Sequence, residues 1–314
     1  KLLAGTDRLN MTRLALNLSG YVNGVAQRHA ETARRMFPGY GIRAVTNGVH
    51  VPTWTHPAFA QMFQEISPDW GHDPEELSGA DQLPDEAVWT AHQAAKGDLL
   101  AEIQKLTGLA MRPDVPLIAF ARRMTGYKRP DLLFTDLERL RAINHTHPFQ
   151  LVMAGKAHPR DEGGKALIAE IHAHMRSLAG DIPMAFLSNY DMALAKTLVA
   201  GADVWLNTPM PPYEASGTSG MKAALNGVLN LSVFDGWWIE AWVEGVTGWA
   251  IGHDDQRHED DAQDLYDKLE GTVLPLYHTD RERWIRMMKD TISKIGPRFN
   301  SQRMMRRYAS EAYL

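Results

Sequence analysis

Five short runs of almost continuous apolar residues limit the folds open to this chain. They lie at 116–121, 149–154, 184–187, 204–206 and 228–233. A strand with one wet face alternates apolar and polar residues, whereas a continuous apolar run suits a strand covered on both faces. Amphipathic stretches at 130–143, 161–179, 190–200 and 219–226 predict helices between the runs. Strands and helices in alternation predict an α/β fold built on a parallel sheet.

Helix and turn signals predict the structure of the segments before and after these alternating strands and helices. Residues 22–37 predict a helix, and with residues 10–18 they look more like the tail of a preceding domain than like the start of one. Residues 262–296 predict two helices, and a last helix at 301–312 follows a Gly-Pro break. Residues 66–87 are rich in Asp, Glu, Pro and Gly, which predicts a flexible surface excursion.

Composition narrows the function classes. Hydrophobic residues at 44% and charged residues at 23% are ordinary for a globular protein able to bury a core. The formal net charge is -5, so the chain lacks the excess of positive charge typical of nucleic-acid-binding proteins, and nucleic acid is not an expected partner. The absence of cysteine excludes disulfides and thiolate metal sites and fits a reducing, cytoplasmic compartment. No apolar run approaches ~20 residues, so neither a membrane span nor an export signal is expected.

A Gly/Ser/Thr loop after the fourth apolar run carries the most chemistry. The segment 213–227 reads YEASGTSGMKAALNG and opens the helix predicted at 219–226. Small residues let backbone N–H groups close on an anion, and the start of a helix adds partial positive charge. Lys222 lies on the first helical turn, where its amine can form a Schiff base with a phosphorylated aldehyde. Glu214, Ser216 and Thr218 supply hydrogen-bonding groups for a polyhydroxylated substrate.

A basic turn follows the first apolar run directly. The segment 121–130 reads ARRMTGYKRP, with three or four cations between a strand and a helix. Arginine offers a planar fork and lysine a point charge, so such a turn suits an oxyanion clamp. The alternative is an ordinary solvated basic turn. The Lys222 loop, placed after another strand of the same sheet, favours the clamp.

A third motif, at 46–54, reads TNGVHVPTW. Its Asn-Gly pair predicts a tight turn, and its tryptophan is first of all a core residue. His50 in this motif is either a substrate contact or a capped core histidine, and the sequence leaves both open.

Together the three motifs resemble the α-glucan (glycogen, starch and maltodextrin) phosphorylases, in the short bacterial and archaeal form. The resemblance runs from about Asn10 to the last residue, with the motifs in the family's order. It implies the Rossmann-like, doubly wound carboxy-terminal domain of a glycosyltransferase-B fold. Residues 1–46 would be the tail of a mostly missing amino-terminal domain. Residues 47–297 would form the domain that binds cofactor and phosphate, and 298–314 a carboxy-terminal helix.

The resemblance also assigns roles to residues. Lys222 would hold pyridoxal 5′-phosphate, and Arg123 and Lys128 would hold the substrate phosphate; these three are the expected catalytic residues. Further cofactor contacts would come from Thr218, Ser219, Arg122, Trp54 and Tyr190. The sugar would be contacted by Asn47, Glu214, Ala215, Ser216 and Gly217. Arg122 stands where animal enzymes have lysine, Ser219 replaces a glycine, and Tyr190 is alternatively a core tyrosine at a helix start.

The implied activity is that of a hexosyltransferase: retaining phosphorolysis of α-1,4-glucan ends by inorganic phosphate, giving α-D-glucose 1-phosphate. No metal is implied, although residues 252–261 contain metal-ligand types in a charge-rich loop. One alternative is a nucleotide-sugar glycosyltransferase. Many of those carry a glutamate at the position of Lys222, and a lysine cannot accept from a ribose hydroxyl. Another is a catalytically silent fragment that binds the cofactor or glucan, and a homo-oligomer is compatible with either.

Overall fold

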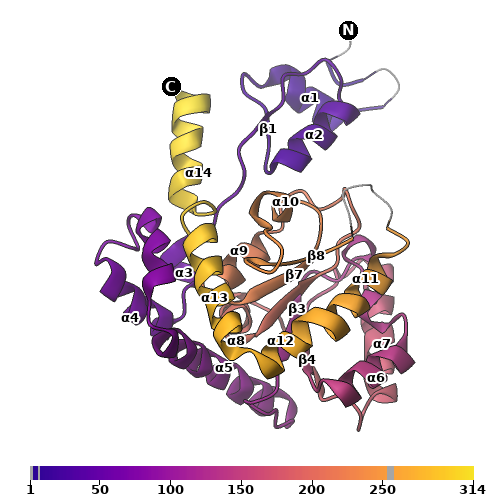
Figure 1. Ribbon diagram of the computed structural model, residues 1–314. Helices are drawn as coiled ribbons and strands as arrows, with labels where there is room; N and C mark the ends of the chain where they lie inside the picture. The colour runs from indigo at the N-terminus through magenta and orange to yellow at the C-terminus, as the bar shows by residue number, and fades with distance from the viewer. Residues whose placement is uncertain (1–2, 6–7, 253–257) are drawn as a thin grey trace.

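A six-stranded, entirely parallel sheet forms the centre of the molecule (Figure 1). The computed structural model describes residues 3–5, 8–252 and 258–314. The strands are β3 (Leu117–Ala121), β4 (Gln150–Ala154), β5 (Met184–Leu187), β6 (Val204–Asn207), β7 (Leu229–Val233) and β8 (Gly248–Ile251). The first five confirm the apolar runs as strands, and β8 adds an edge strand that the sequence analysis missed.

The strand order reverses in the middle of this sheet. The order is β5-β4-β3-β6-β7-β8, so the chain moves outward from β3, returns, and moves outward again from β6. This is the order of a doubly wound Rossmann-like sheet, which confirms the predicted fold class. In such sheets ligands bind beyond the carboxyl ends of the strands, where the order reverses. The loops after β3 and β6 are therefore the place to look for a site.

Helices cover both faces of the sheet and explain the continuous apolar runs. Alternate residues of β3 enter two different hydrophobic clusters, Ile118 and Phe120 one cluster, Leu117 and Ala119 the other. The Leu117 cluster is completed by α5 (Asp85–Thr107) and α8 (Met192–Gly201). The Ile118 cluster includes side chains of α6 (Leu137–Thr146), α7 (Glu162–Ser177) and α13 (Arg281–Ile295).

The remaining helices surround this core or extend from it. They are α1 (Met11–Leu18), α2 (Gln27–Met36), α3 (Val51–Trp54), α4 (Pro57–Ile66), α9 (Thr218–Ala224), α10 (Trp238–Ala241), α11 (Asp261–Lys268), α12 (Leu274–Thr279) and α14 (Ser301–Tyr308). Short 3₁₀ segments are η1 (Pro74–Gln82), η2 (Gly126–Lys128) and η3 (Leu132–Phe134). The π-helical segments η4 (Leu269–Val273) and η5 (Ala309–Tyr313) join α11 to α12 and extend α14. The predicted helices at 262–296 and at the carboxyl end are confirmed. Among the described residues, every helix is too short or too polar to span a bilayer.

Two of the predicted helices have wrong bounds. The helix at 22–37 begins only at Gln27, because β1 (Asn23–Gly24) pairs in parallel with β2 (Arg43–Ala44). The helix at 130–143 is two pieces, η3 and α6, because the Asp136 carboxylate accepts from the Arg139 N–H (2.9 Å) and caps a new helix start.

The prediction of a flexible excursion at 66–87 is wrong. Trp70, Leu77, Ala80 and Leu83 are buried there, and η1 packs against α13. These apolar residues lie three to seven positions apart among acidic ones, so the segment's composition hides an ordered, half-buried face.

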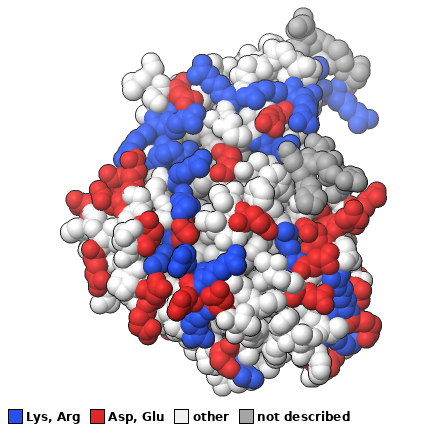
Figure 2. Space-filling model, viewed as in Figure 1, with Lys and Arg blue, Asp and Glu red and all other residues white. Residues whose placement is uncertain are grey.

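The chain enters the sheet domain from a small amino-terminal unit and leaves it toward α14, and the two connecting segments lie side by side (Figure 1). This unit holds α1, α2, β1 and β2, and α14 rises beside it. Between these segments, the Val49 N–H donates to the Phe299 carbonyl (3.0 Å) and the Ser301 N–H to the Val49 carbonyl (2.9 Å). A Cβ on Gly48 would lie 2.0 Å from the Asn300 carbonyl oxygen, so only glycine fits this approach. Lys and Arg side chains gather at this end of the molecule (Figure 2).

Candidate active site

The loops after β3 and β6 meet in a buried cluster of charges. Arg122 and Lys128 come from the basic turn after β3, and both donate to one carboxylate oxygen of Glu214, from the loop after β6. The three residues are 8%, 6% and 9% exposed, respectively. Arg123 lies on the same turn with its side chain exposed. The structure thus brings three predicted site residues together where the strand order reverses.

Burial and mutual attraction set the charges in this cluster. Burial alone would raise the pKa of Glu214, but Arg122 and Lys128 outweigh it and hold the pKa below its usual range. Burial and the neighbouring Arg122 charge lower the pKa of Lys128 to about 8, with Glu214 opposing them. Glu214 is therefore ionised at neutral pH, and Lys128 lies close to its point of proton release.

Arg129, the last cation of the basic turn, has a different position. Its Nε donates to the Thr208 carbonyl (2.9 Å) and its Nη2 to the Pro209 carbonyl (2.9 Å) and to the Asp261 carboxylate. The Thr208 hydroxyl in turn donates to the Arg129 carbonyl (2.8 Å). Arg129 thus connects the loops after β3 and β6. Its charge is neutralised by Asp261, apart from the cluster of Arg122, Lys128 and Glu214.

The lysine of the Gly/Ser/Thr loop faces an aromatic ring. Lys222 lies on α9, and its Nζ is 3.7 Å from the centre of the Trp54 ring. The buried Asn226 amide, one turn on, donates to the carbonyls of Trp54 (2.9 Å) and Lys222 (3.1 Å). No motif in the sequence assigns Asn226 a role, although its four-residue spacing from Lys222 places both on one helix face. Burial lowers the pKa of Lys222, which favours the neutral, nucleophilic amine.

Tyr190 lies near the same end of the sheet. It follows β5 and packs, like Trp54, against the hydrophobic cluster beneath α8. Burial raises the pKa of Tyr190, and the charge of Arg122 partly opposes that rise. Tyr190 and Arg122 are therefore close enough to interact electrostatically.

A turn after β7 braces the loop that carries Glu214. The Asp235 carboxylate accepts from the backbone N–H of Glu214 (3.0 Å) and of Gly236 (2.8 Å). The Trp237 N–H donates to the Ser216 carbonyl (2.8 Å). A Cβ on Gly236, whose φ is +58°, would lie 2.5 Å from that same carbonyl oxygen. From the sequence, residues 235–238 follow a strand end and could position the loop, contact glucan or pack in the cleft wall; the two hydrogen bonds to the loop support the first of these.

Burial raises the pKa of Asp235 to about 6, from an ordinary value of 3.8, and this predicts a pH-dependent stability. Between these two values the folded protein holds a proton on Asp235 that the unfolded chain has lost. The stabilisation is complete below pH ~4 and disappears as the pH rises through ~6. Relative to Asp235→Asn, the wild type should lose about 3 kcal/mol of unfolding free energy across this window.

Urea denaturation of the wild type and Asp235→Asn at closely spaced pH values measures this difference. Each variant serves as the other's control, since all other titrating groups are shared. A stability difference that stays constant from pH 4 to pH 7 would contradict the assignment.

Several buried polar atoms on the loops after β3 and β6 lack a hydrogen-bond partner among the described residues. The buried atoms without a hydrogen-bond partner in the described part of the chain include Arg122 Nη1, Thr125 Oγ1, Asn207 Oδ1 and Ser216 Oγ. Buried polar groups in folded proteins are almost always paired, so such a group of orphans indicates where a ligand supplies the partners. All four lie on β6 or on the loops that follow β3 and β6.

The other predicted residues are distributed around this centre. Ala215 and Gly217 continue the loop, Thr218 begins α9, and the Ser219 hydroxyl accepts from the Trp205 indole N–H (3.2 Å). Asn47 lies on the connecting segment that enters the sheet domain, where its N–H donates to the Val25 carbonyl (3.0 Å) and its carbonyl accepts from Arg303 (3.2 Å). Among the described residues, no hydrogen bond joins Asn47 to the charge cluster.

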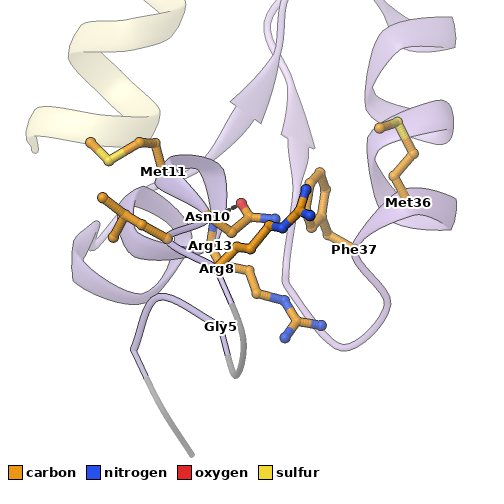
Figure 3. A pocket seen from close by; sticks show the side chains of 8 residues that line it. Gly5, Arg8, Asn10, Met11, Arg13, Met36 and Phe37 are labelled. Atoms are coloured by element: carbon orange, nitrogen blue, oxygen red, sulfur yellow. Dashed lines mark hydrogen bonds between the residues drawn. The ribbon is translucent and has the colours of Figure 1, made fainter.

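Two other regions are weaker candidates. A cavity of about 770 Å³ lies in the amino-terminal unit, lined by Gly5, Arg8, Leu9, Asn10, Met11, Arg13, Met36 and Phe37. Figure 3 shows Arg8 and Arg13 extending toward the Phe37 side of this cavity, but the described residues that line it include no nucleophile or general base. The charge-rich loop at 252–261 includes residues 253–257, which lie outside the described residues. Within the described ranges, no group of three or more carboxylate or imidazole side chains could hold a metal ion.

Known proteins are similar to this chain along nearly its whole length. The family model for carbohydrate phosphorylases matches residues 2–247. The maltodextrin phosphorylase of Thermococcus litoralis is 39% identical over 98% of this chain and 41% of its own length. The glycogen phosphorylases of Aquifex aeolicus and Mycobacterium tuberculosis H37Rv are 40% and 36% identical over 98% of this chain, and over 50% and 40% of their own lengths. This chain thus spans half or less of the length of these relatives. It belongs to the carbohydrate phosphorylase family.

Proposed function

We propose that this chain carries the cofactor- and phosphate-binding half of an α-glucan phosphorylase. The reaction is retaining phosphorolysis of α-1,4-glucan ends, with pyridoxal 5′-phosphate as cofactor and α-D-glucose 1-phosphate as product. The observation that carries the proposal is the pairing of a lysine amine on an aromatic face, Lys222 on Trp54, with the buried cations Arg122 and Lys128. In this view residues 47–297 form the binding domain, and residues 1–46 and 298–314 join it to an amino-terminal half. The absence of cysteine supports a cytoplasmic location.

The residues at this site have the chemistry that pyridoxal phosphate requires. The Lys222 amine, with its lowered pKa, would hold the aldehyde carbon, and the Trp54 face would support a flat ring. The backbone N–H groups of Thr218 and Ser219 lie in the first turn of α9, where no intrahelical acceptor is available. The unpaired Nη1 of Arg122 provides a further donor for an anion.

Arg123 and Lys128 would bind inorganic phosphate beside the cofactor. When bound, pyridoxal phosphate supplies a phosphate group with a pKa near ~6, which suits proton exchange at neutral pH. Two phosphate groups repel each other, so Arg122, Arg123 and Lys128 would supply the positive charge that keeps both in place. The same cations would stabilise the substrate phosphate beside the positive charge that develops on the sugar.

The loop at 214–217, with Asn47, would bind the terminal sugar. An ionised carboxylate accepts but does not donate, and Glu214 would therefore take hydrogen bonds from sugar hydroxyls. The buried hydroxyl of Ser216 has no partner among the described residues and would donate to the sugar or accept from it.

An absorbance spectrum and a phosphorolysis assay test this function. The chain mixed with pyridoxal phosphate should develop the absorbance of a lysine-bound cofactor. Glucose 1-phosphate should form from maltodextrin and phosphate at a high rate only when the amino-terminal half found in the relatives is added. Saturable binding of UDP- or ADP-glucose without any cofactor absorbance would instead favour the glycosyltransferase alternative. Cofactor binding without turnover in either mixture would leave a silent binding fragment.

A further inference from the structure

Glu214 occupies the centre of the anion-binding cluster. Its Oε2 accepts from both Arg122 Nη2 and Lys128 Nζ, and all three side chains are buried. Burying cations without a counter-charge is costly, so a carboxylate between them stabilises the fold. The protein therefore contains its own anion at the position where the proposed function needs an external one.

The cluster carries more positive than negative charge, which favours binding of a second, stronger anion. Arg122, Arg123 and Lys128 carry three positive charges against the single carboxylate of Glu214. Arg122 Nη1 is buried and has no hydrogen-bond partner in the described part of the chain. Arg123 is exposed, and its charge is close enough to lower the pKa of Lys128. A phosphate dianion accepts the same charge-assisted hydrogen bonds as a carboxylate and has more oxygens to accept them. The Glu214 carboxylate and a phosphate would both accept from the Lys128 ammonium and the Arg122 guanidinium. The two anions therefore compete for these donors.

The backbone beneath Glu214 is fixed, so competition acts on the side chain alone. The Asp235 carboxylate holds the Glu214 N–H (3.0 Å), and the Trp237 N–H holds the Ser216 carbonyl (2.8 Å). A displaced Glu214 carboxylate can rotate about its side-chain bonds without moving the loop.

We propose that Glu214 is the resident anion of this clamp, that inorganic phosphate displaces it, and that the displacement releases the carboxylate to accept from a sugar hydroxyl. This deepens the proposed function and rests on it. Phosphate and sugar then bind with positive coupling, since each takes the partner that the other sets free. By linkage the coupling is reciprocal, so a sugar that holds Glu214 away from the clamp raises the affinity for phosphate.

Glu214→Gln tests the displacement, because glutamine keeps the shape and removes the charge. We expect this variant to bind inorganic phosphate at least about tenfold more tightly than the wild type, equal to ~1.4 kcal/mol. It should also melt at a lower temperature without phosphate and gain a larger increase in Tm when phosphate is added, because Arg122 and Lys128 lack a counter-charge until phosphate arrives. Calorimetric titration with phosphate and thermal melts over a phosphate series measure the two effects.

Asp261→Asn is the matched control. Asp261 is also a buried carboxylate paired with a guanidinium of the basic turn, that of Arg129, and its replacement removes one negative charge. It does not touch the clamp, so phosphate affinity should not increase. If Glu214→Gln is unfolded in phosphate-free buffer, phosphate should restore its fold at concentrations that leave the melting of Asp261→Asn unchanged.

The possible outcomes distinguish a failure of the Glu214 displacement from a failure of the proposed phosphorylase function. Phosphate binding by the wild type that is equal to, or tighter than, that of Glu214→Gln overturns the displacement and leaves the phosphorylase proposal intact. An equal gain in Asp261→Asn also overturns it, because net charge alone then explains the effect. Absence of phosphate binding in the wild type and in both variants overturns the inference and the phosphate clamp together.

Discussion

Lys222→Ala should abolish covalent retention of pyridoxal phosphate. In the wild type, the Lys222 amine lies 3.7 Å from the centre of the Trp54 ring, and burial lowers its pKa toward the neutral form that attacks an aldehyde. Borohydride reduction of the protein with its cofactor should therefore leave a stable pyridoxyl group on the peptide that contains residue 222. In the variant, labelling should fall to the background of exposed lysines. Peptide mass spectrometry after reduction measures the label directly and needs no turnover.

Lys156→Ala provides the control for this experiment. Lys156 follows β4 at the same edge of the sheet, but its side chain is exposed. Its replacement should leave the pyridoxyl label on Lys222 unchanged. Equal labelling of Lys222→Ala and the wild type would remove the basis for the cofactor assignment.

Asp203→Ala should cost about 3–5 kcal/mol of unfolding free energy, because it leaves a buried cation without its partner. Asp203 precedes β6, at the end of the sheet opposite the clamp, and accepts from Lys96 Nζ (2.7 Å), His92 Nε2 (2.8 Å) and the Leu117 N–H (2.7 Å). Burial would raise the pKa of Asp203, but Lys96 and His92 outweigh it and keep the carboxylate ionised. Urea denaturation at neutral pH measures the loss.

Two further variants test whether the loss of stability comes from the unpaired buried charge of Lys96. Adding Lys96→Met to Asp203→Ala should recover a large part of the loss, because the unpaired charge is then removed as well. Asp114→Ala breaks a pair between exposed side chains, Asp114 and Arg112, and should change stability little. The role of the buried pair would be refuted if Asp203→Ala and Asp114→Ala had the same small effect.

The sheet was predictable where burial on both faces leaves a mark in the sequence. β3 to β7 are continuous apolar runs because helices cover each side of them. β8 was missed because its four residues begin with a glycine at φ +141° and lie at the sheet's edge. β1 and β2 have two residues each, which is too short for any periodicity. The segment at 66–87 was misjudged because acidic surface residues outnumber the few buried ones.

The candidate site was predictable as a set of motifs but not as a set of contacts. The order of the motifs placed Lys222 and the basic turn after two strands of one sheet, and the structure shows that these strands, β6 and β3, are neighbours. Nothing in the sequence separates Arg129 from Arg122, although one binds Asp261 and carbonyl groups and the other binds Glu214. Which cation faces the site depends on the backbone at Arg129, whose φ of 44° is rare outside glycine. The hydrogen bond from the Glu214 N–H to Asp235 likewise depends on two strands becoming neighbours.

The bonds between the two site loops also fix when the site can form. Arg129 donates to the Thr208 carbonyl across 79 residues of chain, and that intervening chain must first place β4 and β5 on the far side of β3. Contacts between such distant segments are slow to close, whereas helices form locally and early. A nascent or partly folded chain therefore contains the motif residues, but the contacts among Arg122, Lys128 and Glu214 have not yet formed. A ligand that binds only the assembled loops would therefore report completed assembly and would stabilise these long-range contacts.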